Sequence, residues 1–437
     1  MTTKQYDADA YTKKFTANVL SCQLMQPEIF AVILDQTAFF PEAGGQSADT
    51  GTIDDLIVVD VQIDSSGVIT HYCKLKNAAT SGSTSESDEP ISIHDLLEPG
   101  ETLSTQNLPE TREATPVLPL QEGQSVSCEI HWERRYSMMQ HHTGEHLFSG
   151  LVHRDFGYAN VGFHLSDHIC TMDYNGTLTP EDVRRLESEC NRLICQNLPV
   201  TCCFPDEETL QTLDYRCKGE LTPPIRIVTI QSVDCCACCA PHVKYTGEIG
   251  LLKVIERKSY KGGVRLTILC GQKAFADYCR RFDIVNAVSQ LFSSHYETLE
   301  ARVLQLMEER STLIQQLGEV QQQHLASLIR QAPAPAMETP AIFFVENVDT
   351  KSLRQCVNTL MERGDGLCAV FCGNDTEGYR FIAGSNSLAM KSLAEHLRQQ
   401  YGAKCGGSDQ MIQGQIASTQ KEIQKSLEDY INGAGNP

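Results

Sequence analysis

Two histidines, His142 and His146, stand four residues apart in a segment with helical periodicity. Side chains at this spacing project from one face of a helix, so both imidazoles can reach a single metal ion. The metalloprotease motif of the same spacing carries a glutamate directly after its first histidine, where this chain has Thr143. The pair alone therefore fits either half of a metal site or two unrelated histidines on one helix.

A second group of metal-binding side-chain types follows about a hundred residues later, in the segment 234–242, DCCACCAPH. Cys238 and His242 add a thiolate and an imidazole to the histidine pair, and the four form an acceptable ligand set for Zn²⁺. Three nearby cysteines compete for the same role: Cys235, Cys236 and Cys239. A site with open coordination is favoured over a structural one, because structural sites usually pair CxxC motifs and none precedes His142.

Two acids accompany these candidate ligands, Glu145 just before His146 and Asp234 at the start of the cysteine-rich segment. A carboxylate that accepts a hydrogen bond from the outer ring nitrogen of a ligating histidine fixes its tautomer and orientation. The sequence leaves this role open against that of a solvated acid. It also leaves open whether zinc lowers the pKa of a bound water or anchors a substrate while a water activated elsewhere attacks.

The elements that must position these residues divide the chain into parts. Residues 15–75 alternate apolar and polar side chains between turns, which predicts an antiparallel β region. The polar, acidic segment 77–116 predicts a disordered or loosely folded insertion, with a peripheral helix around 93–97 as the alternative. Residues 120–275 mix both patterns and predict an α+β domain. Its expected helices cover 134–152 and 180–196, and its expected strands cover 225–230 and 264–269.

Beyond Val285, apolar residues recur every three or four positions as far as Val320, interrupted at Arg310. This pattern predicts one long helix with an apolar seam, either a coiled coil or an arm packed on another domain. The segment 332–336, APAPA, then ends the helix as a stiff linker. A small α/β domain follows. Its expected strands are 341–345, 367–371 and 380–383, and its expected helices are 350–363 and 387–401.

Length and composition set the remaining bounds. The 437 residues predict two to four domains. A net charge of −20 disfavours phosphate binding by the whole surface. However, residues 77–116 hold eight acids and one arginine, so −7 of that charge lies there and −13 elsewhere. No long apolar stretch and no export signal are visible. We therefore expect a cytoplasmic protein with reduced cysteines and no membrane partner.

At this point the motifs resemble those of a known family, the alanyl-tRNA editing proteins and the editing domain of alanyl-tRNA synthetase. The resemblance is carried by 142–146 (HTGEH) and 238–250 (CCAPHVKYTGEIG). It extends to 34–46 (LDQTAFFPEAGGQ), which is similar to the glycine-rich loop of the family's β-barrel, and to 263–271. The segment 405–414 is similar to the glycine-rich motif of the terminal DHHA1 domain in the long editing proteins. This chain departs from the family in having CCAPH for CGGTH, and Ala43 and Cys405 in place of glycines.

The resemblance implies an α+β protein with four parts: an N-terminal β-barrel (1–125, including the insertion 77–116), a zinc-binding editing domain (126–280), a helical arm (281–331) and a DHHA1-like α/β domain (337–437). It implies a trans-editing hydrolase that deacylates alanine tRNA carrying serine, with glycine as a further substrate left open. One Zn²⁺ per chain would be held by His142, His146, Cys238 and His242. No aminoacylation is expected, because the family's ATP-binding domain does not precede the barrel.

The resemblance also implies roles for further residues. Thr37 would recognise the serine hydroxyl, and it joins Gln46, Glu145 and Asp234 as a catalytic or substrate-recognition candidate. Gly44 and Gly45 would admit the acceptor end of the tRNA. A basic stretch is expected to meet acceptor-stem phosphates, with a solvated strand face as the alternative: Lys253, Arg257, Lys258, Lys261 and Arg265. Gly406 and Gly407 lie in the tail domain, which would touch the outer corner of the tRNA or join two subunits.

Three alternatives remain open at this stage. The chain could instead be a zinc hydrolase acting on a small ester or amide. It could be a non-catalytic RNA-binding or dimerisation protein with a structural zinc. For the oligomeric state, a homodimer through the helical arm and the tail domain stands beside a monomer.

Overall fold

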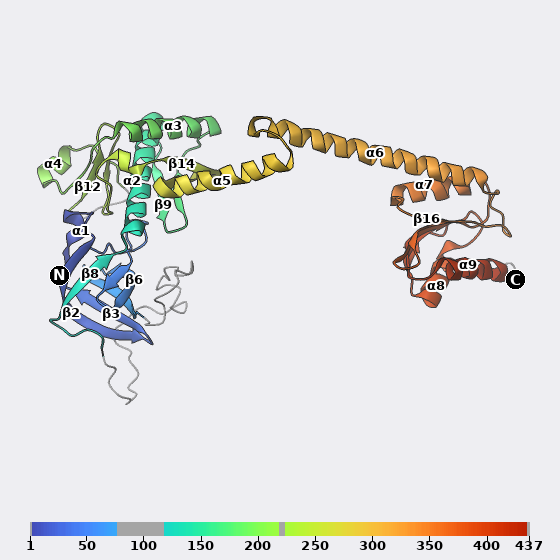
Figure 1. Ribbon diagram of the computed structural model, residues 1–437, viewed down its shortest axis with the longest axis horizontal. Coiled ribbons are helices and arrows are strands. Elements are labelled where there is room, and N and C mark those ends of the chain that lie inside the picture. The colour runs from blue at the N-terminus through green and yellow to red at the C-terminus, as the bar shows by residue number, and fades with distance from the viewer. Residues whose placement is uncertain (1, 77–117, 218–222, 435–437) are drawn as a thin grey trace, which may run out of the picture. The chain divides into compact units, whose positions relative to one another are not determined.

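The computed structural model describes residues 2–76, 118–217 and 223–434, so the expected insertion 77–116 lies outside the described residues. The chain forms two compact units, Met1–Ile284 and Val285–Pro437, each of which is described by itself. Within the described residues, no helix has both the length and the apolar composition that a bilayer crossing requires. The fold is of mixed α+β type, as expected from the sequence (Figure 1).

The first unit begins with a closed barrel whose neighbouring strands are all antiparallel. In spatial order its strands are β2 (Lys14–Gln26), β3 (Ile29–Leu34), β7 (Ile69–Leu75), β6 (Leu56–Ile63), β5 (Gly51–Ile53) and β8 (Ser125–Ile130). On β8 exposed and buried residues alternate, because successive side chains of a strand point to opposite faces. The predicted β region is thus confirmed, and β8 closes it. A short helix α1 (Gln5–Ala8) and the pair β1 (Thr3–Lys4) and β4 (Gln36–Thr37) lie beside the barrel.

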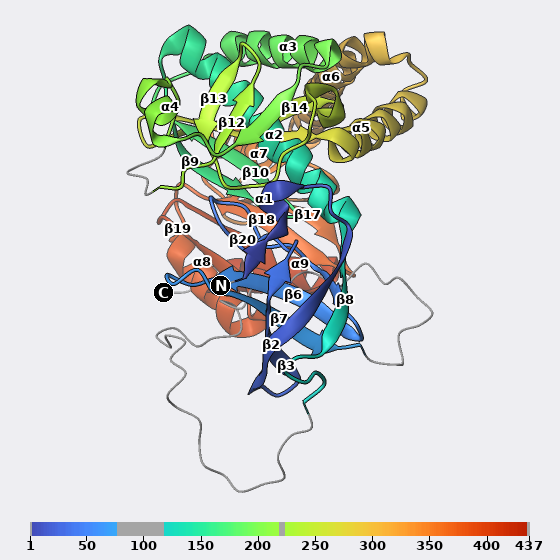
Figure 2. The same ribbon diagram turned by 90° about the vertical axis from the view of Figure 1, so that its left-hand side faces the viewer.

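The last barrel strand passes through His131 into the long helix α2 (Trp132–Phe156), which runs from the barrel into the α+β part of the unit (Figures 1 and 2). Every residue from Met138 to Val152 on α2 is buried, so this helix forms the centre of the unit. Helix α3 (Pro180–Gln196) packs against it. A capping box between Thr179 and Asp182 starts α3, as its sequence predicts.

Two sheets complete the first unit. One has the order β14 (Leu252–Tyr260), β15 (Gly263–Cys270), β10 (Cys170–Tyr174) and β9 (Asn160–Leu165). The other has the order β11 (Val200–Cys203), β12 (Ile227–Ile230) and β13 (Asp234–Ala237). The predicted helices and strands of this region are all confirmed. A short helix α4 (Glu207–Thr212), a 3-10 helix η2 (Thr246–Ile249) and the start of α5 (Gly271–Leu291) are also present.

The second unit is built on one five-stranded sheet with the order β16 (Ala341–Val345), β17 (Cys368–Asn374), β18 (Gly378–Gly384), β20 (Met411–Ile416) and β19 (Lys404–Gly407). Only β16 and β17 are parallel. The end of α6 (Leu299–Gln331) and α7 (Thr350–Met361) share one apolar cluster with the sheet. Helices α8 (Met390–Tyr401) and α9 (Gln420–Ala434) share a separate one. Successive residues of β17 alternate between these clusters, so helices cover both faces of the sheet.

The prediction of one uninterrupted helix from Val285 to Val320 is wrong. Helix α5 ends at Leu291, a 3-10 helix η3 covers Tyr296–Thr298, and α6 starts at Leu299. Ser293 has a positive φ of 48°, which few residues other than glycine adopt inside a helix. The Ser294 and Thr298 hydroxyls bond to each other at 2.9 Å and stabilise the turn. The apolar residues keep their helical spacing across this break, so the sequence pattern gives no sign of it.

Candidate metal centre

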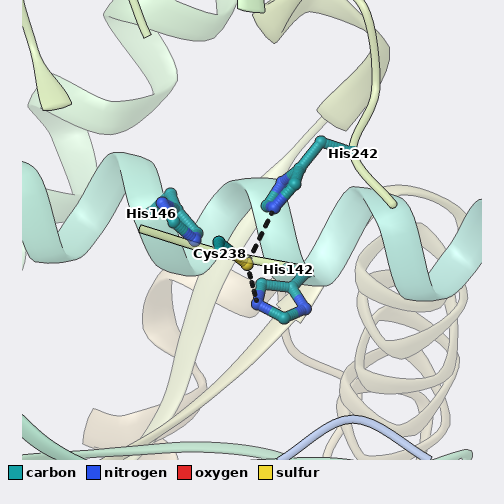
Figure 3. A group of neighbouring side chains, drawn as sticks. All are labelled: His142, His146, Cys238 and His242. Atoms are coloured by element: carbon teal, nitrogen blue, oxygen red, sulfur yellow. Dashed lines mark hydrogen bonds between the residues drawn. The ribbon is translucent and has the colours of Figure 1, made fainter. Parts of the chain in front are cut away.

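Four buried or half-buried side chains converge within the first unit, and they are the four that the sequence predicts as metal ligands: His142, His146, Cys238 and His242. The first two project from α2 and the others from the loop after β13 (Figure 3). The Cys238 Sγ atom lies 3.5 Å from His142 Nε2 and 3.4 Å from His242 Nε2. A tetrahedral zinc ion with ordinary bond lengths separates sulfur from nitrogen by about 3.5 Å. The donor set therefore fits Zn²⁺.

Each of the three imidazoles is oriented through its outer nitrogen. His142 Nδ1 lies 2.7 Å from Gln46 Oε1, His146 Nδ1 lies 2.9 Å from Asp234 Oδ2, and His242 Nδ1 lies 3.0 Å from Thr143 Oγ1. A ring that donates from Nδ1 keeps the Nε2 lone pair free for a metal. Because all three rings are fixed in this way, the arrangement differs from a chance gathering of buried histidines.

The charges of the cluster also suit a metal. Burial alone would raise the pKa of the Cys238 thiol, but the neighbouring His142 and His242 hold that pKa well below its usual range. Burial lowers the pKa of His242 to about 3. Burial also acts to lower the pKa of His146, but hydrogen bonds to Asp234 and Cys238 outweigh it and raise that pKa. These shifts favour the thiolate form of Cys238 and the neutral form of His242, both of which bind zinc, whereas zinc has to displace a proton from His146.

Two glycines on α2, Gly144 and Gly150, let strands β15 and β13 pack closely against the helix near the candidate ligands. A Cβ atom on Gly150 would lie 2.8 Å from the Asp234 Cβ, so glycine allows β13 to bring Asp234 to His146. A Cβ on Gly144 would lie 2.6 Å from Cys270 Sγ, at the end of β15. Both glycines lie inside a helix, where glycine is costly relative to alanine. Close packing around the ligand pair is what they provide.

A buried ion pair attaches the glycine-rich barrel loop, residues 38–49, to the ligand helix. The Arg135 guanidinium is fully buried. Its Nε donates to both Asp49 carboxylate oxygens at 2.9 Å, and its Nη2 donates to the Ala38 carbonyl at 2.6 Å. Arg135 lies seven residues before His142, so two helical turns separate them on one face of α2. The loop brings Gln46 to His142, and the Gln46 Nε2 atom is buried without a hydrogen-bond partner in the described part of the chain.

The two loop glycines that the sequence assigns to the tRNA end both have positive φ, 61° at Gly44 and 82° at Gly45. A Cβ on Gly45 would lie 2.4 Å from the Phe163 carbonyl oxygen. Its own carbonyl accepts a hydrogen bond from Leu165 N at 2.7 Å. The close backbone approach at Gly45 is therefore to β9 of the same chain. Approach of a tRNA end to Gly44 and Gly45 stays a prediction.

Thr37 lies fully buried on β4, among barrel residues. Its hydroxyl oxygen is 2.8 Å from His71 Nε2 and accepts a hydrogen bond from Phe39 N at 3.1 Å. His71 Nδ1 faces the Val32 carbonyl at 3.0 Å, and burial lowers the pKa of His71 to about 4. His71 is therefore neutral with its proton on Nδ1, and the Thr37 hydroxyl donates to Nε2. Toward any ligand, this hydroxyl can then only accept a hydrogen bond.

Glu145 does not make the contact expected of it, a hydrogen bond with the outer ring nitrogen of a ligand histidine. Gln46, Thr143 and Asp234 are the partners of the three Nδ1 atoms. Its Oε1 atom accepts a hydrogen bond from the Ser149 hydroxyl at 2.6 Å and another from Asn160. Its Oε2 atom lies 3.8 Å from His146 Nε2, on the side of the ring that faces Cys238. Asp234 does accept a hydrogen bond from an outer ring nitrogen, that of His146, and its role at a metal site stays a prediction. Sequence reasoning gave no role to Thr143, Arg135 or His71, and of these only Thr143 lies within a recognised motif, the segment 142–146.

The three other cysteines of the segment 234–242, Cys235, Cys236 and Cys239, are not part of the four-residue ligand group. Cys236 is buried and forms a second group with His146 and Asp234. Both of those side chains are already engaged, His146 in the four-donor cluster and Asp234 in hydrogen bonds. Cys235 is half-buried and Cys239 is exposed. Within the described residues, neither Cys235 nor Cys239 joins a group with metal-ligand spacing.

The basic stretch expected to meet RNA lies on β14, on β15 and in the turn between them. Three of its cations are in ion pairs, Lys253 with Glu187 (2.6 Å), Lys258 with Glu256 (2.8 Å) and Arg265 with Asp173 (2.6 Å). Arg257 donates to the Leu178 carbonyl, and the Lys261 ammonium lies over the Tyr260 ring. These partners fit the solvated strand face that the sequence left as the alternative, and contact with RNA stays a prediction. Gly406 and Gly407 lie on β19, an edge strand of the second unit.

Comparison with known proteins agrees with this site. The family model described as the threonyl and alanyl tRNA synthetase second additional domain matches residues 225–267, which contain Cys238 and His242. The model described as tRNA synthetases class II (A) matches residues 3–88. Two parts of the chain are thus similar to domains of tRNA synthetases.

Two curated editing proteins match almost the whole chain. Alanyl-tRNA editing protein AlaX-L of Pyrococcus horikoshii is 26% identical over 97% of this chain and 96% of its own length. Alanyl-tRNA editing protein Aarsd1 of Rattus norvegicus is 23% identical over 97% of each. The alanine–tRNA ligase of Pyrococcus abyssi is 26% identical over 97% of this chain, which spans 42% of that larger protein. The resemblance to long-form alanyl-tRNA editing proteins is confirmed, and the chain is their relative.

Proposed function

We propose that this protein is a trans-editing hydrolase that removes a wrongly attached amino acid from alanine tRNA. The observation that carries the proposal is the convergence of three oriented imidazoles and one thiolate on a point that fits Zn²⁺. The similarity to full-length editing proteins supports the substrate class.

In the proposed reaction, water attacks the ester that joins the amino acid to the terminal ribose. Zn²⁺, when bound, supplies positive charge that polarises the ester or favours the hydroxide form of water. The ion would be held by His142, His146, Cys238 and His242, while Gln46, Asp234 and Thr143 keep the three rings in place. Glu145 contributes a buried carboxylate beside His146 Nε2 that can accept a hydrogen bond from the attacking water.

We further propose that serine is the amino acid removed and that Thr37 selects it. The Thr37 hydroxyl donates to His71 and accepts from Phe39 N, so it has one lone pair left for a ligand. The serine hydroxyl can donate to that lone pair, whereas alanine has no donor. A site built around such a bond rejects the analogue that lacks it. The role of glycine as a further substrate stays open, as does a DHHA1-like role of the second unit in holding tRNA.

The proposal is tested with purified protein and two substrates, seryl- and alanyl-alanine tRNA. We expect rapid release of serine, slow release of alanine, and loss of serine release in His142→Ala, with tRNA binding unchanged. A matched control is His164→Ala, because His164 lies on β9 outside the ligand group. Equal stability of both substrates in the presence of the zinc-loaded protein would reject the proposal.

A second candidate function is favoured by one observation. Four protein donors fill a tetrahedral site, and filled sites are typical of structural zinc. The protein would then be a non-catalytic tRNA-binding or dimerisation protein. That candidate predicts that zinc removal unfolds the first unit and that no ester hydrolysis is detectable. Retained fold with lost hydrolysis after zinc removal favours the editing function.

A further inference from the structure

Arg216 lies behind Asp234, which holds His146. The Arg216 guanidinium forms two parallel hydrogen bonds with the Asp234 carboxylate, from Nε to Oδ1 at 2.7 Å and from Nη2 to Oδ2 at 2.9 Å. The same Oδ2 atom accepts the hydrogen bond from His146 Nδ1 at 2.9 Å. An unbroken series of contacts therefore runs from Arg216 through Asp234 and His146 to the centre of the ligand group.

The backbone at Arg216 is fixed as firmly as its side chain. Arg216 N donates to the Cys235 carbonyl at 2.8 Å, and the Arg216 carbonyl accepts from Ala237 N at 2.9 Å. These bonds form a parallel bridge to Cys236, so the segment lies directly alongside β13. Because Asp234 is on β13, the guanidinium reaches its carboxylate from the neighbouring backbone. The planar, two-pronged geometry is specific to arginine, since a lysine ammonium is a point charge.

The contact between Arg216 and Asp234 is largely buried, so its loss would leave a carboxylate that water cannot readily solvate. The Asp234 side chain is 2% exposed and the Arg216 side chain 16% exposed. This buried carboxylate accepts hydrogen bonds from both His146 and Arg216. Without the arginine, a buried carboxylate would lose its permanent positive partner and two of its donors. It would then be free to rotate away from His146 or to recruit a cation itself.

We infer that Arg216 is a positioning residue of the metal centre, which fixes Asp234 so that His146 presents Nε2 to the ion. This inference rests on the metal site of the proposed function and names a residue that no sequence motif marks. Arg216 is not a member of the ligand group, so it would act through Asp234. Partners that orient metal-ligating histidines typically contribute about 10- to 100-fold to metal affinity.

The experiment measures the zinc affinity of the full-length protein by competition with a chromophoric chelator, for wild type, Arg216→Met and Arg216→Lys. Each protein is also loaded with Co²⁺, whose visible spectrum reports the coordination geometry and the cobalt–thiolate bond. We expect Arg216→Met to weaken zinc binding about tenfold or more and to alter the cobalt spectrum. Arg216→Lys should recover part of the affinity, because it restores the charge but not both hydrogen bonds.

Arg265→Met is the matched control for these two measurements. Arg265 pairs with Asp173 through the same two-pronged geometry, from Nε at 2.6 Å and from Nη2 at 2.7 Å, on a different sheet of the unit. The control should keep wild-type zinc affinity and cobalt spectrum. Zinc binding by Arg216→Met within twofold of wild type with an unchanged spectrum would overturn the inference. An equal loss in Arg265→Met would do so as well, because it would reveal a general effect on stability.

Two further outcomes keep the inference and the proposed function apart. If Arg216→Met does not fold, Arg216→Lys carries the test, and wild-type affinity and spectrum in that variant refute the inference. If wild type hydrolyses seryl-tRNA but Arg216 variants bind zinc normally, the inference fails alone. If the Arg216 variants lose zinc but wild type leaves seryl-tRNA intact, the proposed function fails and the positioning role of Arg216 stands.

Discussion

Replacing Arg135 by methionine is the most demanding test of how the barrel is joined to the ligand helix. The Arg135 side chain is 0% exposed and the Asp49 side chain 2% exposed. Methionine would leave the Asp49 carboxylate buried with the backbone donor Phe40 N as its remaining described partner. It would also remove the described side-chain donor from the carbonyls of Ala10 and Ala38.

The expected magnitude follows from these contacts. Breaking a buried ion pair by removing one partner costs about 3–5 kcal/mol. Each carbonyl left without a donor adds about 1–3 kcal/mol, partly offset because methionine fills apolar space and the loop can relax. We expect the free energy of unfolding of the first unit to fall by about 5 kcal/mol. That is a large share of the roughly 5–15 kcal/mol typical of whole domains.

The assay is urea unfolding followed by tryptophan fluorescence. The chain has a single tryptophan, Trp132, which lies on α2 three residues before Arg135. Its signal isolates the first unit, which is necessary because a chain with two units need not unfold in one step. A loss below about 1 kcal/mol would refute the reasoning. The double variant Arg135→Met, Asp49→Leu should be more stable than Arg135→Met alone, because it removes the unpaired buried carboxylate.

Three other outcomes are expected. Burial lowers the pKa of His71 from 6.5 to about 4, so between these pH values the unfolded chain binds a proton that the folded chain does not bind. The free energy of unfolding should therefore be highest above pH 6.5 and fall toward pH 4 by up to about 1.4 kcal/mol per pH unit. A urea midpoint that stays constant across this window would contradict the assignment. Gly144→Ala should lower the thermal midpoint, because the added Cβ would lie 2.6 Å from Cys270 Sγ. Overpacking of this kind costs about 1–3 kcal/mol of stability, against a gain of about 1 kcal/mol from replacing glycine in a helix. The control Gly318→Ala on α6, which has open space at its Cβ, should show no such loss by circular dichroism. Chelation should lower the free energy of unfolding of the first unit, followed by Trp132 fluorescence, by about 2.7 kcal/mol relative to protein with free zinc at a hundred times its dissociation constant. An equal loss of stability in the second unit, followed by circular dichroism, would argue against a site confined to the first unit.

Features with local signals could be predicted from the sequence. Helix α3 begins where Thr179 and Pro180 place it, because a capping box needs only residues three positions apart. The histidine pair could be placed on one helix face for a similar reason. The pairing of that helix with Cys238 and His242 came from donor chemistry and family resemblance, and the geometry supports it.

Features that depend on distant residues could not be predicted. Gln46 and His142 are 96 positions apart, Thr143 and His242 are 99 apart, and nothing in either segment specifies the partner. The break at Ser293 was hidden because the apolar spacing does not change there, although the backbone does. The ion pairs of the basic stretch could not be predicted for a related reason. Its lysines and arginines are visible in the sequence, but acids such as Glu187 and Asp173, with which they pair, come from other elements.

The separation of the ligands along the chain has a consequence for how the metal is acquired during synthesis. The histidines of α2 leave the ribosome first, and Cys238 follows His142 by 96 positions. Domains form in order from the amino terminus, so the nascent barrel and helix offer an ion only two imidazoles until β13 and its loop emerge. The complete four-residue site for the ion can form only after His242 has been translated. It requires nothing from the second unit, so the ion can be captured while the carboxy-terminal part is still being made.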